Sequence, residues 1–409
     1  MKNITKYILI GSAALLGACE PSVDSFTPSR GTADFSNYVA VGDSYTAGYT
    51  DGALGKRGQE SGFSCILATQ LAHVGGNGFH QPEVKEGSVG STTLPDGSKS
   101  GYYELKVGEN GLAPVPGPGN MAIFADRLYN ADKPFQNFGI PGAKSSHLLA
   151  PGYATLNPFY ARFASSSTTT VLADVLVTDP TFISLWIGGN DVLTYALEGG
   201  EADQITDPVM FTAYINGLVS QLFANGRKGA VANIPSINDI PYFNHILSNG
   251  HLPLIIKDES APGEVRQLIE GEKILLGASP LLEADYGQSI DKPLPARYVL
   301  DLEEVKAIND ATEKYNKVIY DLCHSSDFEI AFVDLHKVMK ELTDTGIVVD
   351  GQLFSSKFVT GGAFSLDGIH ANGKGSAIIA NAFIDAINDE YNASVPRANV
   401  NDYDGVLFP

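Results

Sequence analysis

Four short stretches of the chain combine residue types that suit nucleophilic catalysis. The first is Gly42-Asp43-Ser44, which directly follows the strand-like apolar run 38–41. A serine at the end of such a strand can point its hydroxyl into a crevice, while nearby backbone N–H groups stay free to bind an anion. Aspartate and serine are also ordinary helix N-caps, so this triplet acquires weight only from the other stretches.

Two glycine-containing stretches could supply hydrogen-bond donors to the same crevice. Residues 137–143 place Gly139 and Gly142 in a tight turn, which can bring a backbone N–H close to a bound atom. Taken alone, this pattern is also typical of a plain turn. Asn190 follows two glycines after the buried-strand run 182–187, so its side-chain amide could donate into the crevice. The alternative is that Asn190 is simply part of a turn that ends the strand.

An aspartate and a histidine near the C-terminus complete the set. Asp367 lies three residues before His370 in a glycine-rich loop that leads into the helical pattern 376–388. At this spacing the carboxylate can hold one ring nitrogen while the other nitrogen faces the serine. Two other Asp/His pairs have a weaker setting, since one ends a helical run and the other has no further ligands for a metal: Asp321/His324 and Asp334/His336.

In this order, the four stretches resemble the sequence blocks of the SGNH (GDSL-type) hydrolase superfamily. The resemblance implies that Ser44 is the nucleophile, His370 the general base and acid, and Asp367 the residue that orients the histidine. It also implies an oxyanion hole formed by the backbone N–H groups of Ser44 and Gly142 and the side-chain amide of Asn190. Each motif is short, and their ordered occurrence from one end of the chain to the other carries the resemblance.

The activity implied by the resemblance is serine-dependent hydrolysis of a carboxylic ester, as in an esterase, lipase or acylhydrolase. The reaction would proceed through an acyl-enzyme on Ser44 and would need no metal and no organic cofactor. The expected substrate is a small ester or an acylated glycan or lipid. The alternative is a catalytically silent surface lipoprotein that binds glycans or lipids on the same fold. The complete set of five residues favours the enzyme, because a binding protein has no need of all five.

The expected fold is an α/β, three-layer α/β/α sandwich with a mostly parallel central sheet, similar to flavodoxin. Further strand-like runs at 229–235 and 332–334 alternate with helical patterns. Residues 34–409 are predicted to form a single hydrolase domain, because the motifs span nearly the whole chain. The motif spacing exceeds what βα units require, so we expect insertions at about 51–136 and 242–300. The first is expected to contain long loops and the second to form a helical or hairpin cap over the crevice.

The N-terminus has the pattern of an export signal. Lys2 and Lys6 precede the apolar run 7–16, which is too short to span a bilayer and ends in small residues before Cys19. This resembles a bacterial lipobox, and the extended motifs at 42–49 and 365–370 also resemble lipoprotein members from Bacteroidetes-type bacteria. The expectation is a signal peptide at 1–18, a lipid on Cys19, a flexible tether at 19–33 and a lipid-anchored protein in the bacterial cell envelope. An ordinary secretory signal is the alternative.

Composition excludes several other classes of protein. The 409 residues carry 27 Lys+Arg against 47 Asp+Glu, a net charge of −20, whereas nucleic-acid binding requires a basic face. Three cysteines are too few for a disulfide framework or a cysteine-rich zinc site. The sequence leaves open whether Cys65 and Cys323 pair, and it also leaves the oligomeric state open.

Overall fold

Five strands form a fully parallel central sheet. The computed structural model describes residues 27–90, 100–108, 111–120, 124, 126–248, 250, 253–258, 261 and 263–409. The strands of the sheet are β1 (Tyr38–Gly42), β6 (Asn137–Gly139), β7 (Phe182–Trp186), β8 (Lys228–Ala232) and β13 (Ile330–Val333). Their spatial order is β13-β8-β7-β1-β6, and each neighbouring pair is parallel. The chain therefore reverses its winding direction next to β1, where doubly wound α/β proteins bind their ligands.

Both faces of the sheet are buried, as the apolar runs require. Alternate residues of β1 enter different cores: Val39 and Val41 pack into one, and Tyr38 and Ala40 into the other. Such two-sided burial is typical of parallel sheets that are covered by helices on both faces. The predicted three-layer α/β fold with a parallel sheet is confirmed.

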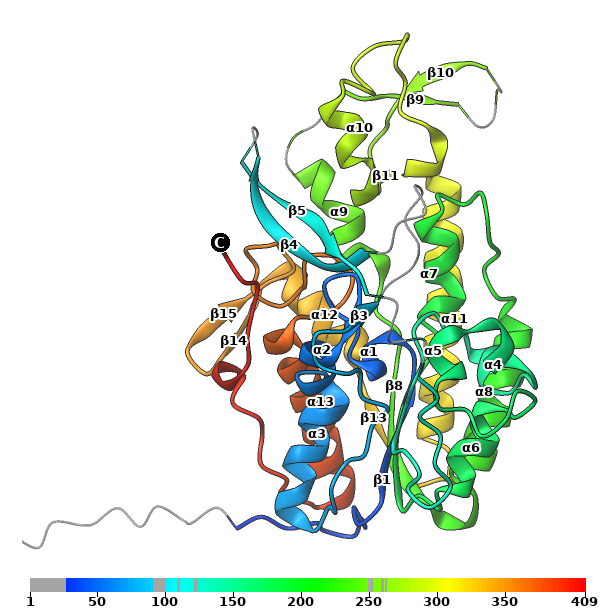
Figure 1. The fold of residues 1–409 in the computed structure, drawn as a ribbon. Helices are drawn as coiled ribbons and strands as arrows, with labels where there is room; N and C mark the ends of the chain where they lie inside the picture. The colour runs from blue at the N-terminus through cyan, green and yellow to red at the C-terminus, as the bar shows by residue number, and fades with distance from the viewer. Residues whose placement is uncertain are drawn as a thin grey trace, which may run out of the picture.

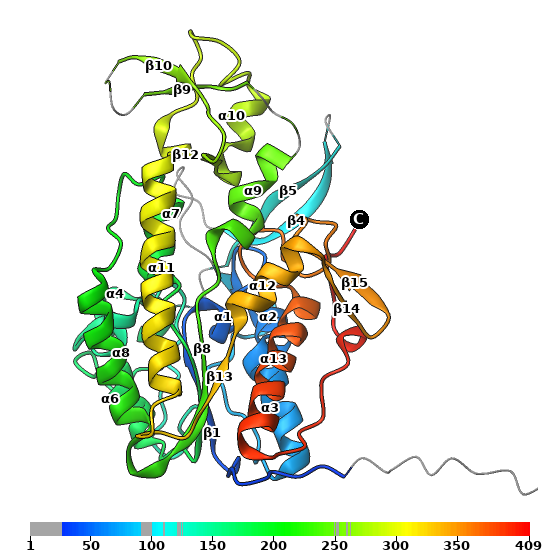
Figure 2. The same cartoon turned by 180° about the vertical axis from the view of Figure 1, so that it is seen from behind.

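Helices form the two outer layers, one on each side of the sheet in Figures 1 and 2. One layer contains α3 (Phe63–Leu71), α12 (Leu335–Asp344) and α13 (Gly373–Tyr391). The other contains α6 (Val171–Val177), α7 (Asn190–Leu197), α8 (Pro208–Leu222) and α11 (Leu302–Cys323). Helix α11 starts with a capping box, in which Asp301 and Glu304 each accept a hydrogen bond from the other's backbone N–H. These helices pack on both faces of the sheet, whose carboxyl ends lead into the loops that carry the motifs.

The first predicted insertion, 51–136, has more regular structure than expected. Within it, α3 belongs to a main helix layer, and short elements precede and follow it: β2 (Leu54–Gly55), α2 (Lys56–Glu60), η1 (Ala72–Val74) and β3 (Val89–Gly90). Residues predicted as loop form the hairpin of β4 (Ser100–Gly108) and β5 (Gly111–Pro118). The prolines of β5 hid this strand from the sequence analysis. They are tolerated because, within the described residues, β5 pairs with β4 alone, so its prolines interrupt no second ladder of hydrogen bonds.

The second predicted insertion, 242–300, forms a small unit that we call the cap. Its elements are α9 (Pro241–Ser248), β9 (Ile255–Lys257), β10 (Val265–Gln267), β11 (Lys273–Ile274), η6 (Leu276–Ala278), α10 (Ser279–Glu283), η7 (Ala296–Tyr298) and β12 (Val299–Leu300). The cap has its own apolar core, which includes Ile246, Ile256 and Ile274. It lies beyond the carboxyl ends of the strands in Figure 1, and the Tyr242 N–H donates to the Gly368 carbonyl oxygen at 2.9 Å. The cap is therefore in direct contact with the loop that carries the Asp/His pair.

The N-terminal motifs, including Cys19 and the predicted signal peptide, lie outside the described residues. The last residues of the predicted tether pack on the folded domain, because Ser29 and Ser394 exchange two backbone hydrogen bonds. The folded domain thus includes residues that precede Asp34. Among the helices of the described residues, none has the length and apolar character needed to cross a membrane. Cys65 and Cys323 are both free thiols, on α3 and at the end of α11.

Candidate active site

Three of the four motifs meet because they follow neighbouring strands of the sheet. Ser44 is the first residue of the short helix α1 (Ser44–Ala47), directly after β1. Asn190 begins α7 after β7, and Gly142 lies in the turn after β6. Since β1 pairs with both β6 and β7 in parallel register, the three residues lie at the same edge of the sheet. The fourth motif reaches this edge in the loop before α13.

A continuous hydrogen-bonded chain connects Ser44, His370 and Asp367. The Ser44 hydroxyl lies 2.8 Å from Nε2 of His370, and Nδ1 of the same ring lies 2.8 Å from Oδ2 of Asp367. An ionised carboxylate only accepts, so Nδ1 carries the proton and donates, and Nε2 accepts from the serine hydroxyl. The side chains of His370 and Asp367 are 12% and 8% exposed, so they are shielded from water while the serine remains within reach.

The Asp367 carboxylate is held by four further donors besides the histidine ring. Its Oδ1 atom accepts from the backbone N–H groups of Ile369 and His370, each at 2.8 Å, and from the Ser365 hydroxyl at 3.1 Å. Its Oδ2 atom accepts from the Gly52 N–H at 2.8 Å. Burial raises the pKa of Asp367, but His370 and the backbone N–H groups outweigh it and hold this pKa below its ordinary value. The carboxyl group therefore stays ionised and orients the imidazole.

Two tyrosines flank the imidazole ring. The ring centroids of Tyr45 and Tyr49 lie 5.2 Å and 4.9 Å from that of His370. The Tyr45 hydroxyl donates to the Ile369 carbonyl oxygen at 2.5 Å, and burial raises the pKa of Tyr45, which keeps this donor protonated. The Tyr45 side chain thereby ties the helix of the nucleophile to the loop of the histidine.

Three N–H groups are the donors predicted for the oxyanion hole. Among the described residues, the backbone N–H groups of Ser44 and Gly142 have no acceptor. Gly142 has a φ of +78°, a backbone conformation that glycine adopts without strain. The Asn190 side chain donates one of its two N–H groups to the Ala143 carbonyl oxygen at 3.0 Å. This bond fixes the amide next to the turn of Gly142, and the second N–H can donate to a ligand.

The turn around Gly142 is anchored by residues that the sequence analysis did not single out. Asp191 is fully buried and accepts from both the backbone N–H and the hydroxyl of Ser145, at 2.8 Å and 2.7 Å. Asn157 donates to the Pro141 carbonyl oxygen at 2.9 Å. Because Asp191 directly follows the predicted site residue Asn190, the sequence could have indicated its role. No feature of the sequence indicated the role of Asn157. Together these contacts fix the turn that presents the Gly142 N–H.

Comparison with known families identifies the group to which this site belongs. A family model described as GDSL-like lipase/acylhydrolase matches residues 38–383, which include all four motifs. The chain belongs to this family. Its members are lipases and acylhydrolases, so at the level of the family the protein is an ester hydrolase.

Similarity to individual proteins is more distant. No curated protein sequence matches the chain. Among solved structures, LAE5, an alpha/beta hydrolase enzyme from the metagenome of Lake Arreo, is 13% identical, with 87% of this chain and 96% of that chain covered and a TM-score of 0.40. A catalytic mutant of an acetylxylan esterase from Geobacillus stearothermophilus is 14% identical, with 87% and 95% covered and a TM-score of 0.38. A Clostridium thermocellum family 3 carbohydrate esterase is 14% identical, with 87% and 96% covered and a TM-score of 0.36.

The aspartate of the GDSL-like motif has a structural role. The Asp43 carboxylate caps α1 by accepting a hydrogen bond from the Tyr45 N–H at 3.1 Å. Asp43 is only 7% exposed. Burial raises its pKa to about 6, although the Tyr45 N–H and His370 oppose this effect. An ionised Asp43 therefore costs stability, and the cost appears as the pH rises from about 4 to about 6.

Asp43→Asn should therefore stabilise the protein at neutral pH. Asparagine caps a helix as well as aspartate and carries no charge to bury. We expect a gain of roughly 1–3 kcal/mol in the free energy of unfolding above pH 6, and no gain near pH 4, where the wild-type carboxyl is protonated. Calorimetric Tm values of both proteins at pH 4 and pH 7.5 measure this. A gain of equal size at both pH values would contradict the role of the buried charge.

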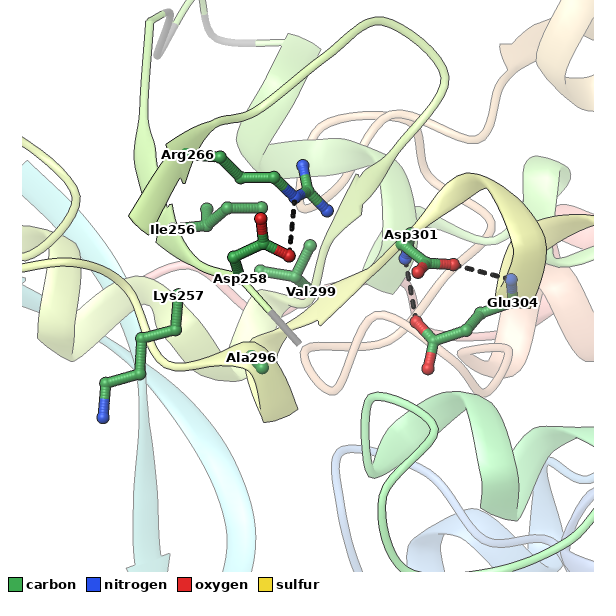
Figure 3. Close-up of a pocket in the computed structure, with 8 residues that line it drawn as sticks. All are labelled: Ile256, Lys257, Asp258, Arg266, Ala296, Val299, Asp301 and Glu304. Atoms are coloured by element: carbon green, nitrogen blue, oxygen red, sulfur yellow. Dashed lines mark hydrogen bonds and ion pairs between the residues drawn. The ribbon is translucent and has the colours of Figure 1, made fainter. Parts of the chain in front are cut away.

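Other candidate residues of the sequence lie apart from this family's site. Asp334 caps α12, and His324 follows the end of α11 and stacks on Tyr320 with ring centroids 3.9 Å apart. A pocket of about 70 Å³ lies in the cap, lined by Ile256, Lys257, Asp258, Arg266, Ala296, Val299, Asp301 and Glu304 (Figure 3). Four of its polar residues pair with one another, Arg266 with Asp258 at 3.8 Å and Asp301 with Glu304 through the capping box. No triad residue lines this pocket.

Proposed function

We propose that the protein is a serine-dependent carboxylic-ester hydrolase that works through an acyl-enzyme on Ser44. The observation that carries this proposal is the unbroken hydrogen-bonded chain from Ser44 through His370 to Asp367, with both links at 2.8 Å. A serine hydroxyl is unreactive at its ordinary pKa, and the hydrogen-bonded His370 ring supplies the base that it needs. The expected substrates remain small esters and acylated glycans or lipids.

In the first half of the reaction, His370 acts as the general base. Its Nε2 atom takes the hydroxyl proton as Ser44 Oγ attacks the ester carbonyl carbon. The resulting imidazolium is stabilised by the Asp367 carboxylate, which does not itself become protonated. Nε2 then returns the proton to the leaving alkoxide. The alcohol departs and the acyl group stays on Ser44.

In the second half, water takes the place of the serine hydroxyl. Nε2 of His370 removes a proton from water as its oxygen attacks the acyl carbonyl carbon. Collapse of the second tetrahedral intermediate returns the proton to Ser44 Oγ and releases the carboxylic acid. In both halves, negative charge develops on the carbonyl oxygen. The N–H donors of Ser44, Gly142 and Asn190 are proposed to bind that oxyanion.

The alternative is a surface protein that binds glycans or lipids without catalysis. A panel of p-nitrophenyl esters from C2 to C12, together with acetylated xylan and acetylated peptidoglycan, separates the two functions. We expect saturable turnover of at least one p-nitrophenyl ester, because such activated esters need little substrate recognition. Absence of turnover on every member, with binding to a glycan or lipid, would favour the alternative.

We also propose that Cys19 carries a lipid that anchors the enzyme to a membrane of the bacterial cell envelope. The proposal rests on the apolar run 7–16 and on the small residues before Cys19. Several acyl chains at one site bind a membrane stably, whereas a single chain is marginal. The protein expressed in its host should partition into Triton X-114, and Cys19→Ser should move it to the aqueous phase. Equal partitioning of both would refute the anchor.

A further inference from the structure

A tight turn follows the nucleophile helix directly. Residues 50–53 form a two-residue hairpin turn, in which the N–H groups and carbonyls of Thr50 and Ala53 bond reciprocally at 3.1 Å and 3.0 Å. Asp51 and Gly52 at its centre have φ values of 48° and 76°. Two consecutive positive φ angles with the sequence Asp-Gly are typical of a type I′ turn. We call residues 50–53 the Asp51 turn.

The Asp51 turn contacts each residue from Ser365 to Asp367. Its Asp51 N–H donates to the Ser365 hydroxyl at 3.0 Å, and the Asp51 carboxylate accepts the Leu366 N–H at 2.8 Å. The Gly52 N–H donates to Asp367 Oδ2 at 2.8 Å, the same oxygen that accepts from the His370 ring. The turn therefore joins the segment of the nucleophile to the segment of the triad carboxylate.

A cation and the β4–β5 hairpin brace the turn from outside. Arg57 donates to Asp51 Oδ2 at 2.6 Å, and the two side chains are 38% and 13% exposed. The guanidinium lies over the Tyr102 ring at 4.3 Å. The Tyr103 N–H of the same strand donates to the Asp51 carbonyl oxygen at 2.7 Å. Burial raises the pKa of Asp51, and the Leu366 N–H and Arg57 counteract it, so the ion pair favours the ionised form that binds Leu366.

We propose that the Asp51 turn, braced by Arg57, is a positioning device that sets the Asp367 carboxylate against the His370 ring. This inference rests on the proposed function, because it assigns the turn a role in the same triad. Asp51 touches none of the reacting atoms, and it acts through Leu366 and Asp367. A carboxylate displaced from the ring weakens the orientation of the imidazole and so affects chemistry more than substrate binding.

Asp51→Ala tests the proposal. It removes the acceptor of the Leu366 N–H and places a residue with a low preference for positive φ in the turn. We expect kcat for p-nitrophenyl acetate to fall about 100-fold, with KM changed less than threefold. The rate is expressed per folded molecule, with the folded fraction measured by far-UV circular dichroism, so that an unfolded fraction does not count. Asp51→Asn keeps an acceptor oxygen and tolerates positive φ, so it should recover kcat to within about tenfold of wild type.

Asp350→Ala provides a matched control. Asp350 and Gly351 have φ values of 47° and 80° in the turn between β14 (Ile347–Val349) and β15 (Gln352–Phe354). The Asp350 carboxylate also accepts a backbone N–H, that of Val400, at 2.9 Å. The same substitution here should lower stability and leave kcat per folded molecule unchanged. Equal kcat losses in the two alanine variants would mean that the Asp51 turn has only a general structural role.

Arg57→Gln keeps the test decisive if Asp51→Ala does not fold. This half-exposed side chain can be replaced without changing the backbone of the turn, and we expect a fivefold lower kcat with unchanged KM. If Asp51→Ala folds, a kcat loss no larger than that of Asp350→Ala would overturn the inference. If Asp51→Ala does not fold, an unchanged kcat in Arg57→Gln would overturn it. Failure of the proposed function would give a different result, because the wild-type protein itself would then show no turnover.

Discussion

Ser44→Ala should lower ester hydrolysis by about 10⁵-fold or more and leave the fold intact. The substitution removes the oxygen that would form the acyl-enzyme, and His370 then has no nucleophile to activate. Removal of a triad nucleophile typically costs about 10⁶-fold in kcat, and the remaining rate comes from substrate binding and the oxyanion hole. Initial rates with p-nitrophenyl acetate measure the loss. Far-UV circular dichroism and Tm establish that the variant is folded.

Ser236→Ala is the matched control for Ser44→Ala. Ser236 also follows a strand of the parallel sheet, and its hydroxyl accepts the Asn238 N–H at 3.1 Å. It lies outside the hydrogen-bonded chain of the triad, so its replacement should leave the rate within about twofold of wild type. A folded Ser44→Ala protein with wild-type turnover would remove Ser44 from the mechanism.

Asn190→Ala should lower kcat by about 10²–10³-fold with little change in KM. The amide N–H is proposed to donate to the oxyanion, whose charge develops only in the transition state, so its loss affects kcat rather than ground-state binding. The variant also loses the 3.0 Å hydrogen bond to the Ala143 carbonyl oxygen. This loss loosens the turn of Gly142 and should lower kcat further. Steady-state kinetics over a range of ester concentrations separate kcat from KM.

Asn381→Ala controls for the loss of a buried asparagine. Asn381 is 1% exposed and, like Asn190, donates to a backbone carbonyl oxygen, that of Ala398 at 2.9 Å. It lies in α13, so its replacement should lower Tm and leave kcat unchanged. A change in KM alone for Asn190→Ala would exclude Asn190 from the oxyanion hole.

The sequence predicted the elements that have a strong local pattern. Strands β1 and β7 are apolar runs buried on both faces, and glycines mark where they end. Strand β6 was missed because it has three residues, one of them the polar Asn137. That side chain is nevertheless buried, and it donates to the Thr46 carbonyl oxygen at 2.9 Å. Such a bond depends on the folded arrangement and leaves no periodic signal in the sequence.

The candidate site shows the same difference between residues with a local sequence pattern and residues whose contacts depend on the fold. The motif residues stand out because their types and spacing suit one reaction, and the structure brings Ser44, His370 and Asp367 within hydrogen-bond distance. The supporting residues do not stand out, since Asp51 and Leu366 are 315 positions apart in the chain. The dipeptide Asp51-Gly52 was a readable signal for a hairpin turn. Nothing local indicated that this turn would hold the triad carboxylate.

Covalent labelling of the wild-type enzyme tests the central claim most directly. A fluorophosphonate reacts with a serine only where a base activates the hydroxyl, so the labelled residue identifies the nucleophile. Labelled protein is digested and the modified peptide is mapped by mass spectrometry, with His370→Ala as the matched variant that lacks the base. We predict one label per chain on Ser44 and loss of labelling in His370→Ala. Absence of label on Ser44, or equal labelling of the two proteins, would contradict the proposed mechanism.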